Sequence, residues 1–290
     1  GWNDKSGTRW KVCWIPLGGY VKFFGDRNVF SQADQEELLK KYSKEDQHKL
    51  FVTKPLYQRA LIVAGGPLAN FILALVIFTF IYMFAGKDFT PAVIDEVLKD
   101  SPAEVAGMQK NDVIIEIDNT KVESILDVSK LIAMSTSEFI DFKVSRYDQE
   151  IILKVKPNFV DSVDELGNKL KKRMVGIKLS PYNNQITHKK LGPAQALLQS
   201  FNEVYFVTTS SLKYLGSMFT GAGDSSQLGG PIRIAKISGQ VAEFGIIPFV
   251  SMMAYISISL GLINLFPIPL LDGGHLMFYA FEKVLGRPLS

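Results

Sequence analysis

Two long uncharged runs constrain what this chain can fold into more than any other feature. No charged residue occurs between Arg59 and Lys87, or between Glu243 and Asp272. A helix of about 20 apolar residues crosses a hydrocarbon core roughly 30 Å thick. The runs therefore predict transmembrane helices at residues 60–86 and 244–271. A pair of core helices in a large soluble protein is the alternative.

The rest of the chain is too polar for a pure membrane bundle. Hydrophobic residues make up 47% of the sequence and charged residues 21%, which favours a protein that is part membrane and part water-soluble. The net charge of +3 is small and dispersed, so no nucleic-acid partner is expected. Cys13 is the one cysteine and cannot form an intramolecular disulfide.

The connector between the two runs has the pattern of a folded domain. Alternating apolar residues predict strands at Val113–Ile117 and Ile151–Val155, with a helix over Ser124–Ser135 between them. Residues 197–219 have apolar residues at helical spacing, interrupted by charges. They predict an amphipathic helix at the membrane surface, with a packed soluble helix as the alternative.

The N-terminal region, residues 1–58, carries more Lys and Arg than Asp and Glu, which favours a cytoplasmic location for it. Within it, residues 10–24 show two strand-like segments around Leu17-Gly18-Gly19 and predict a β-hairpin.

The end of the second run, NLFPIPLLDGG at residues 264–274, combines residues that a membrane helix normally excludes. A carboxylate there costs about 2.5 to 3.5 kcal/mol unless it is paired, protonated or bound to a cation. Pro267 and Pro269 interrupt the helix, and Gly273-Gly274 allows a close backbone approach. The pattern predicts a polar pocket that contains Asp272. Spacing alone equally favours Asp272 as the N-cap of a helix in residues 272–290.

This segment resembles the N-x-x-P-x-P-x-L-D-G-G signature of the site-2 protease family of intramembrane zinc metalloproteases. GGYVKFFGD (18–26), GGPLAN (65–70) and LGGPIRIAK (228–236) are similar to segments of its bacterial RseP branch. The resemblance implies that Asp272 is the third protein ligand of a catalytic Zn²⁺ and that Asn264 lies in the active-site pocket beside the substrate. The residues expected to contact substrate are Asn264, Pro267 and Pro269, together with Gly18, Gly19, Tyr20 and Val21 of a membrane-associated hairpin that captures unwound substrate as an added strand.

A structural role is predicted for four small or polar residues. Gly66 and Asn70, one helical turn apart, are expected to pack closely against the zinc-bearing helix. Gly273 and Gly274 are expected to shape the backbone beside Asp272.

The other two zinc ligands in this family are the histidines of an HExxH motif, whose helical spacing places both imidazoles on one face. This sequence contains no HExxH, so no catalytic residue is assigned within it. We expect the chain to be a fragment of a longer protein whose first membrane helix carries that motif. His275 is interpreted as a neighbour of the ligand or a helix-start residue, because Gly273-Gly274 disfavours a regular helical pair with Asp272.

SPAEVAGMQKNDVIIEIDNTKV (101–122) resembles the core pattern of a PDZ domain, expected over residues 90–157. Asn111 and Asn119 stand where glycine is usual and are predicted to adopt positive φ. The strand at Thr90–Val97 is predicted to line a groove for an extended peptide or protein ligand. Residues 158–243 form a post-PDZ region.

The resemblance implies an α+β polytopic membrane protein with transmembrane helices, a membrane-associated β-hairpin and an inserted PDZ domain. It implies a metalloendopeptidase of the bacterial inner membrane, with the PDZ domain on the periplasmic side. The expected substrates are transmembrane proteins such as anti-sigma factors or remnant signal peptides, trimmed beforehand by another protease. A non-catalytic PDZ-containing membrane adaptor is the alternative, and a transporter fragment with a broken helix is a third.

Overall fold

The structure is a computed structural model that describes residues 1–5, 7–11, 42–47, 49–163, 169–181, 185–219 and 230–286. Helices and strands divide into two compact units, one of residues 1–66 with 265–290 and the other of residues 67–264. The predicted hairpin residues Gly18, Gly19, Tyr20 and Val21 lie outside the described residues.

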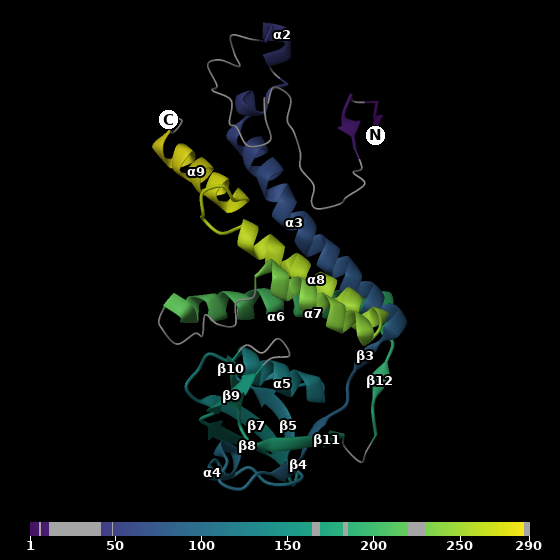
Figure 1. Ribbon diagram of the computed structural model, residues 1–290, viewed down its shortest axis with the longest axis vertical. Coiled ribbons are helices and arrows are strands. Elements are labelled where there is room, and N and C mark those ends of the chain that lie inside the picture. Colours follow the sequence, from purple (N-terminus) through teal and green to yellow (C-terminus); the bar gives the residue numbers. More distant parts are fainter. Residues whose placement is uncertain are drawn as a thin grey trace. The chain divides into compact units, whose positions relative to one another are not determined.

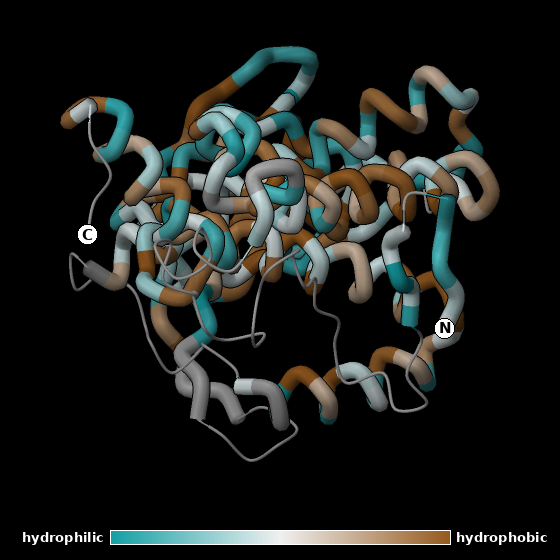
Figure 2. Tube along the Cα trace, turned by 90° about the horizontal axis from the view of Figure 1, so that it is seen from above, coloured by the Kyte–Doolittle hydropathy of each residue, from teal (hydrophilic) through white to brown (hydrophobic). Residues whose placement is uncertain are grey.

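Within the described part of the chain, two helices are long and apolar enough to cross a membrane, judged by length and composition. The first is α3 (Leu56–Phe80), which continues as the π-helix η2 (Ile81–Ala85), and the second is α8 (Ile246–Asn264). Coloured by hydropathy, the helical coils of the trace carry many hydrophobic residues, drawn in brown (Figure 2). Helix α8 ends at Asn264, short of the predicted residue 271. Pro267 and Pro269 account for this early end, because proline has no N–H to donate and its ring clashes with a preceding turn.

Small residues let α3 and α8 approach closely within the second unit. A Cβ added to Gly261 would lie 3.1 Å from the Pro67 carbonyl oxygen and 3.2 Å from Asn70 Cβ. The Ser257 hydroxyl donates to the Asn70 carbonyl oxygen at 2.9 Å. The Asn70 contact described here is thus with α8, a packing role through an interhelical hydrogen bond.

The segment between these helices contains a six-stranded antiparallel sheet of order β11-β4-β5-β7-β8, with β6 paired to β5 (Figure 1). We call residues 87–189 the strand domain. The predicted strands at 113–117 and 151–155 are confirmed as β5 and part of β8. The sheet also includes β11, beyond the predicted domain end at 157. The strands of the sheet are β4 (Ala92–Val97), β5 (Val113–Ile117), β6 (Thr120–Lys121), β7 (Ile140–Arg146), β8 (Gln149–Val155) and β11 (Ile177–Pro181).

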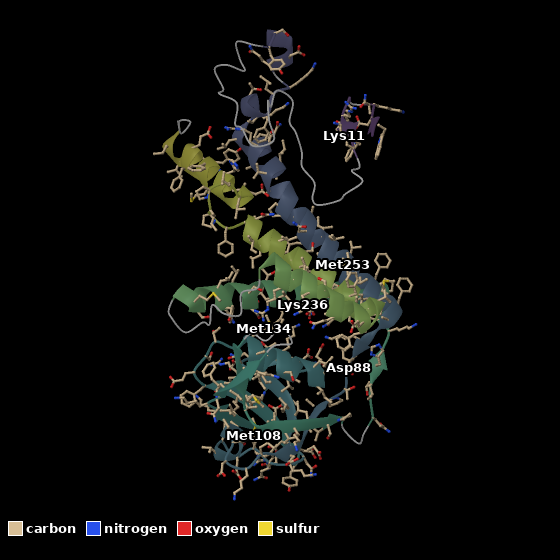
Figure 3. All side chains as sticks on the ribbon, viewed as in Figure 1. Lys11, Asp88, Met108, Met134, Lys236 and Met253 are labelled. Carbon is tan, nitrogen blue, oxygen red and sulfur yellow. The ribbon has the colours of Figure 1, made fainter. Side chains whose placement is uncertain are left out.

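Helix α5 (Ile125–Met134) covers this sheet and confirms the predicted helix at 124–135. It begins with a capping box, in which the Ser124 hydroxyl accepts from the Asp127 N–H and the Asp127 carboxylate accepts from the Ser124 N–H. Its buried face joins a core that contains Phe142 and Met108, the latter labelled within the domain in Figure 3. The short helix α4 (Pro102–Val105) begins at a Ser101 cap.

Several of the positive backbone φ angles belong to Asn and Asp residues in turns. Asn111 has φ 71° and Asn119 has φ 60°, which confirms the prediction for both. Asparagine tolerates this region better than most residues. Tyr147 and Asp148, with φ 50° and 62°, turn the chain between β7 and β8, a turn that the sequence analysis missed.

The predicted groove strand stays a prediction. Strand β4 pairs with β11 along one edge, whereas along the other edge only its first residues, Ala92 and Val93, pair with β5. Further along β4, Asp95, Glu96 and Val97 line a pocket together with Glu104, Met108, Gln109 and Lys110. Strand β11 ends the described sheet and has one neighbour, β4. A separate hairpin of β9 (Asn158–Val163) and β10 (Lys169–Met174) precedes it.

The strand domain connects to the helices of the second unit at its two ends. Strand β3 (Lys87–Asp88) follows η2 directly and pairs with β12 (His188–Lys189), which leads into α6 (Pro193–Phe219); Figure 3 labels Asp88 at this connection. The Lys130 ammonium of α5 lies 2.5 Å from the Glu203 carboxylate of α6. Glu203 also accepts from the Tyr255 hydroxyl of α8 at 2.8 Å. Helix α7 (Pro231–Glu243) packs beside α8 (Figure 1).

The other unit contains helix α9 (Asp272–Leu285), the first part of α3, and several short elements. Trp2 and Trp10 pair across two short strands and stack at 6.3 Å between ring centroids. The short elements are β1 (Trp2–Asn3), β2 (Arg9–Trp10), α2 (Lys44–Gln47) and the 3-10 helix η1 (Phe51–Thr53).

Candidate metal centre

The loop at residues 265–271 is a compact, strained connection ahead of α9. The Ile268 N–H donates to the Phe266 carbonyl at 2.7 Å, and the Leu271 N–H donates to the Ile268 carbonyl at 3.2 Å. Leu270 has φ 77°, a left-handed conformation that is unfavourable for a residue with a bulky side chain. Such strain persists where surrounding structure holds it, and it concentrates at functional sites.

Two glycines allow this loop to lie against the first turn of α9. A Cβ added to Gly273 would lie 2.2 Å from the Leu265 carbonyl oxygen, and one added to Gly274 would lie 2.4 Å from the Ile268 carbonyl oxygen. Both distances are far below a van der Waals contact with backbone, so any side chain would force the loop and the helix apart. The geometry agrees with the structural role predicted for both residues.

Asp272 is the first residue of α9, and its side chain does not cap the helix. The N-cap is Leu271, which makes no side-chain capping hydrogen bond. The alternative interpretation of Asp272 as an N-cap is therefore wrong. Its place in the first turn still favours a negative charge, because the helix N-terminus carries a partial positive charge.

The Asp272 carboxylate lies half-buried against α3. A Cβ added to Gly66 would lie 3.3 Å from Asp272 Oδ2, so only a glycine leaves room for this oxygen without displacement. Burial raises the pKa of the Asp272 carboxyl above its usual range, while the nearby charge of His275 acts in the opposite direction.

The expectation that Gly273-Gly274 prevents a regular helical spacing between Asp272 and His275 is wrong. Gly273 and Gly274 are both helical, so Asp272 and His275 stand three apart in a regular helix rather than in an irregular turn. Close packing against the preceding loop stabilises this helical start despite the low helix propensity of glycine. The two side chains therefore share one side of the first turn.

A carboxylate in this state fits as one ligand of a zinc ion. Zinc accepts carboxylate oxygens, and a divalent cation would stabilise the charge that burial disfavours. In the described part of the chain, no group of three His, Cys, Asp or Glu residues is arranged to hold a metal. His188 instead lies in β12, with Nε2 2.7 Å from the Ala85 carbonyl oxygen. Asp272 can thus supply one ligand, and the remaining ligands must come from elsewhere.

The other residues predicted from the motif surround this loop in the chain. Asn264 is the last residue of α8 and is partly exposed, and Pro267 and Pro269 are exposed on the loop. The sequence analysis missed three residues of α3 and α9 that contact one another: Arg59, Tyr279 and Glu282. The one sequence signal that could have drawn attention to these residues is the position of Arg59 directly before the first uncharged run.

Comparison with known proteins defines the class to which this geometry belongs. The family described as Peptidase family M50, the site-2 proteases, matches residues 1–290. The chain belongs to this family, which confirms the resemblance. The protein is accordingly a zinc-dependent metalloprotease.

Named relatives are similar in sequence to this chain along nearly its whole length. "Putative zinc metalloprotease Atu1380" of Agrobacterium fabrum is 39% identical over 290 residues, which cover 100% of this chain and 77% of the relative. "Putative zinc metalloprotease R01501" of Rhizobium meliloti has the same identity and coverage. "Metalloprotease MmpA" of Caulobacter vibrioides is 33% identical over 310 residues, covering 99% of this chain and 77% of the relative.

Among solved structures, the PDZ domain of the SdrC-like protein (Lin2157) from Listeria innocua matches 33% of this chain and 99% of that domain. The sequence identity is 20% and the TM-score is 0.25, a similarity too low to assign a fold.

Proposed function

We propose that this chain supplies the carboxylate half of the active site of an intramembrane zinc metalloprotease. The observation that carries the proposal is the half-buried Asp272 carboxylate, which lies against Gly66 at the start of α9. The HExxH half of the site, which this sequence does not contain, is expected in the complete protein. When bound, zinc supplies a Lewis acid and lowers the pKa of a bound water toward ~7.

The proposed substrates are single-pass membrane proteins such as anti-sigma factors or remnant signal peptides. The two candidate spans support a membrane location, and peptide bonds in a helical substrate must be unwound before attack. Loop 265–271 provides exposed, non-helical backbone next to Asp272, as an unwinding site requires. We assign substrate contacts to Asn264, Pro267 and Pro269, and strand capture to residues 18–21.

The remaining segments receive roles in this arrangement. We assign the strand domain as a PDZ domain on the periplasmic side of the inner membrane, with its ligand groove beside β4, since Asp95, Glu96 and Val97 of β4 line a pocket. Helix α6 buries Ala196, Ser200 and Val204 on one face and exposes an apolar stripe on another, as a helix at a membrane surface does. The stripe consists of Leu198, Phe201, Tyr205 and Leu212.

The decisive experiment substitutes Asp272→Asn in the complete protein, which keeps the side-chain shape and removes the ligand charge. We expect loss of zinc-dependent cleavage of a single-pass reporter in reconstituted membranes, together with loss of bound zinc. Asp148→Asn, at an exposed turn where asparagine tolerates φ 62°, is the matched control and should retain both. Full zinc content and cleavage in Asp272→Asn would refute the assignment of Asp272 as a zinc ligand, whereas absence of zinc and cleavage in the unsubstituted complete protein would favour the non-catalytic adaptor.

A further inference from the structure

An ion pair joins α3 to α9 at the end of α9 opposite Asp272. Arg59 Nη2 lies 2.8 Å from Glu282 Oε1, and each side chain is 18% exposed. The Arg59 guanidinium also lies over the Tyr279 ring, 5.1 Å from its centroid. The three residues form a set of contacts that is independent of the carboxylate proposed to bind zinc.

This ion pair is not explained well by a contribution to stability. Removing two charges from water opposes folding, and a buried pair commonly returns little more than that penalty. In addition, the Nε atom of Arg59 is buried and has no hydrogen-bond partner among the described residues. An unsatisfied buried donor adds a further unfavourable contribution. A role in setting geometry accounts better for the arrangement.

Helical periodicity shows which geometry the contacts set. Seven residues separate Arg59 from Gly66 on α3, and seven separate Asp272 from Tyr279 on α9. Seven residues advance a helix by about 10 Å and return to within ~20° of the same face. The Gly66–Asp272 contact and the Arg59–Tyr279 contact therefore mark two points of one antiparallel seam, equally spaced along both helices.

Two points along a seam determine both the register and the rotation of α9 on α3. A slide of one residue would move α9 by about 1.5 Å and turn its side chains by about 100°. Such a change would carry the Asp272 carboxylate away from Gly66. A side-chain oxygen that binds a metal must stay within roughly 0.2 Å of its coordination distance. A contact at the far end of the seam from Asp272 therefore helps to keep its carboxylate in place.

We propose that Arg59 and Glu282 are positioning residues that hold α9 in the register in which Asp272 presents its carboxylate. The inference rests on the proposed function of Asp272 as a zinc ligand. Tyr279 supports the pair by covering the guanidinium with its ring, which favours one orientation of the Arg59 side chain.

The test measures zinc affinity of the complete protein by chelator competition and the visible absorption spectrum of its Co²⁺ form, which reports ligand geometry. Arg59→Gln and Glu282→Gln are each expected to weaken zinc binding about 10- to 100-fold and to change the Co²⁺ spectrum. The exchange of charges, Arg59→Glu with Glu282→Arg, is expected to recover part of the affinity. Lys283→Gln, which removes an exposed neighbouring charge on α9, should leave both readouts unchanged.

The outcomes separate this inference from the function on which it rests. Asp272→Asn is measured in parallel, and full zinc affinity in that variant would overturn the proposed function and the positioning role together. Loss of zinc in Asp272→Asn with normal zinc affinity and spectrum in both ion-pair variants overturns the positioning role alone. If Arg59→Gln does not fold, Arg59→Lys keeps the charge without the planar guanidinium, and the same two readouts decide.

Discussion

The consecutive glycines Gly65 and Gly66 offer a direct test of where the Asp272 carboxylate lies. A Cβ added to Gly65 meets no atom within 4 Å, whereas one added to Gly66 lies 3.3 Å from Asp272 Oδ2. The second distance is shorter than ordinary contact, so the carboxylate of a Gly66→Ala variant must move by a few tenths of an ångström. Gly65→Ala is the matched control on the same helix.

The size of the expected effect follows from metal-ligand geometry. Zinc binds carboxylate oxygen at about 2.0–2.2 Å with a tolerance of roughly 0.2 Å, which is no larger than the forced displacement. We expect Gly66→Ala to weaken zinc binding about tenfold, equivalent to about 1.4 kcal/mol. Helix propensity acts the other way in both variants, since alanine is favoured over glycine by about 0.8–1.0 kcal/mol. A lower affinity in Gly66→Ala would therefore not come from a weaker helix.

The assay is zinc affinity of the complete protein in bilayers, measured by competition with a chromogenic chelator, beside cleavage of a single-pass reporter. Gly65→Ala should retain both properties and Gly66→Ala should lose affinity and cleavage together. Equal zinc affinities in the two variants would refute the placement of the Asp272 carboxylate against Gly66.

Three further predictions concern the stability of the strand domain and are measured by urea unfolding. Arg146→Ala removes the ion-pair partner, at 2.7 Å, of the Asp112 carboxylate, whose side chain is 1% exposed, and should destabilise the domain by about 3–5 kcal/mol. Lys156→Ala removes one member of an exposed ion pair and should cost under about 1 kcal/mol. Equal losses of stability in the two variants would contradict the reasoning. Asn111→Ala should destabilise the domain by about 1–2 kcal/mol because Asn111 has φ 71°, whereas Asn111→Gly should be nearly neutral. An unchanged stability in Asn111→Ala would argue against the left-handed conformation at this turn. Ser124→Ala removes the cap of α5 and should cost about 0.5–2 kcal/mol, and an unchanged midpoint would show that the capping box contributes nothing.

Local features of this protein followed from the sequence because neighbouring residues determine them. Hydrophobic periodicity predicted β5 and α5, since a strand or helix with one apolar face must bury that face whatever lies opposite. Asn111 and Asn119 were recognisable at positive φ because the preference belongs to the residue and its turn. The motif at 264–274 predicts Asp272 as a zinc ligand through its resemblance to the family signature, whereas spacing alone could not distinguish a ligand from a helix cap.

Features that depend on which distant segments meet required the structure. Strand β11 pairs with one edge of β4 although their paired residues are 80 or more positions apart, and no local pattern in either strand indicates this pairing. Arg59 and Glu282 are 223 positions apart, and nothing local to either residue indicates the other. The sequence by itself determined the class of protein and singled out Asp272 as the expected zinc ligand. Only the tertiary structure brought Asp272 against Gly66 and Arg59 against Glu282, because long-range contacts depend on how the helices pack and not on the pattern within either one.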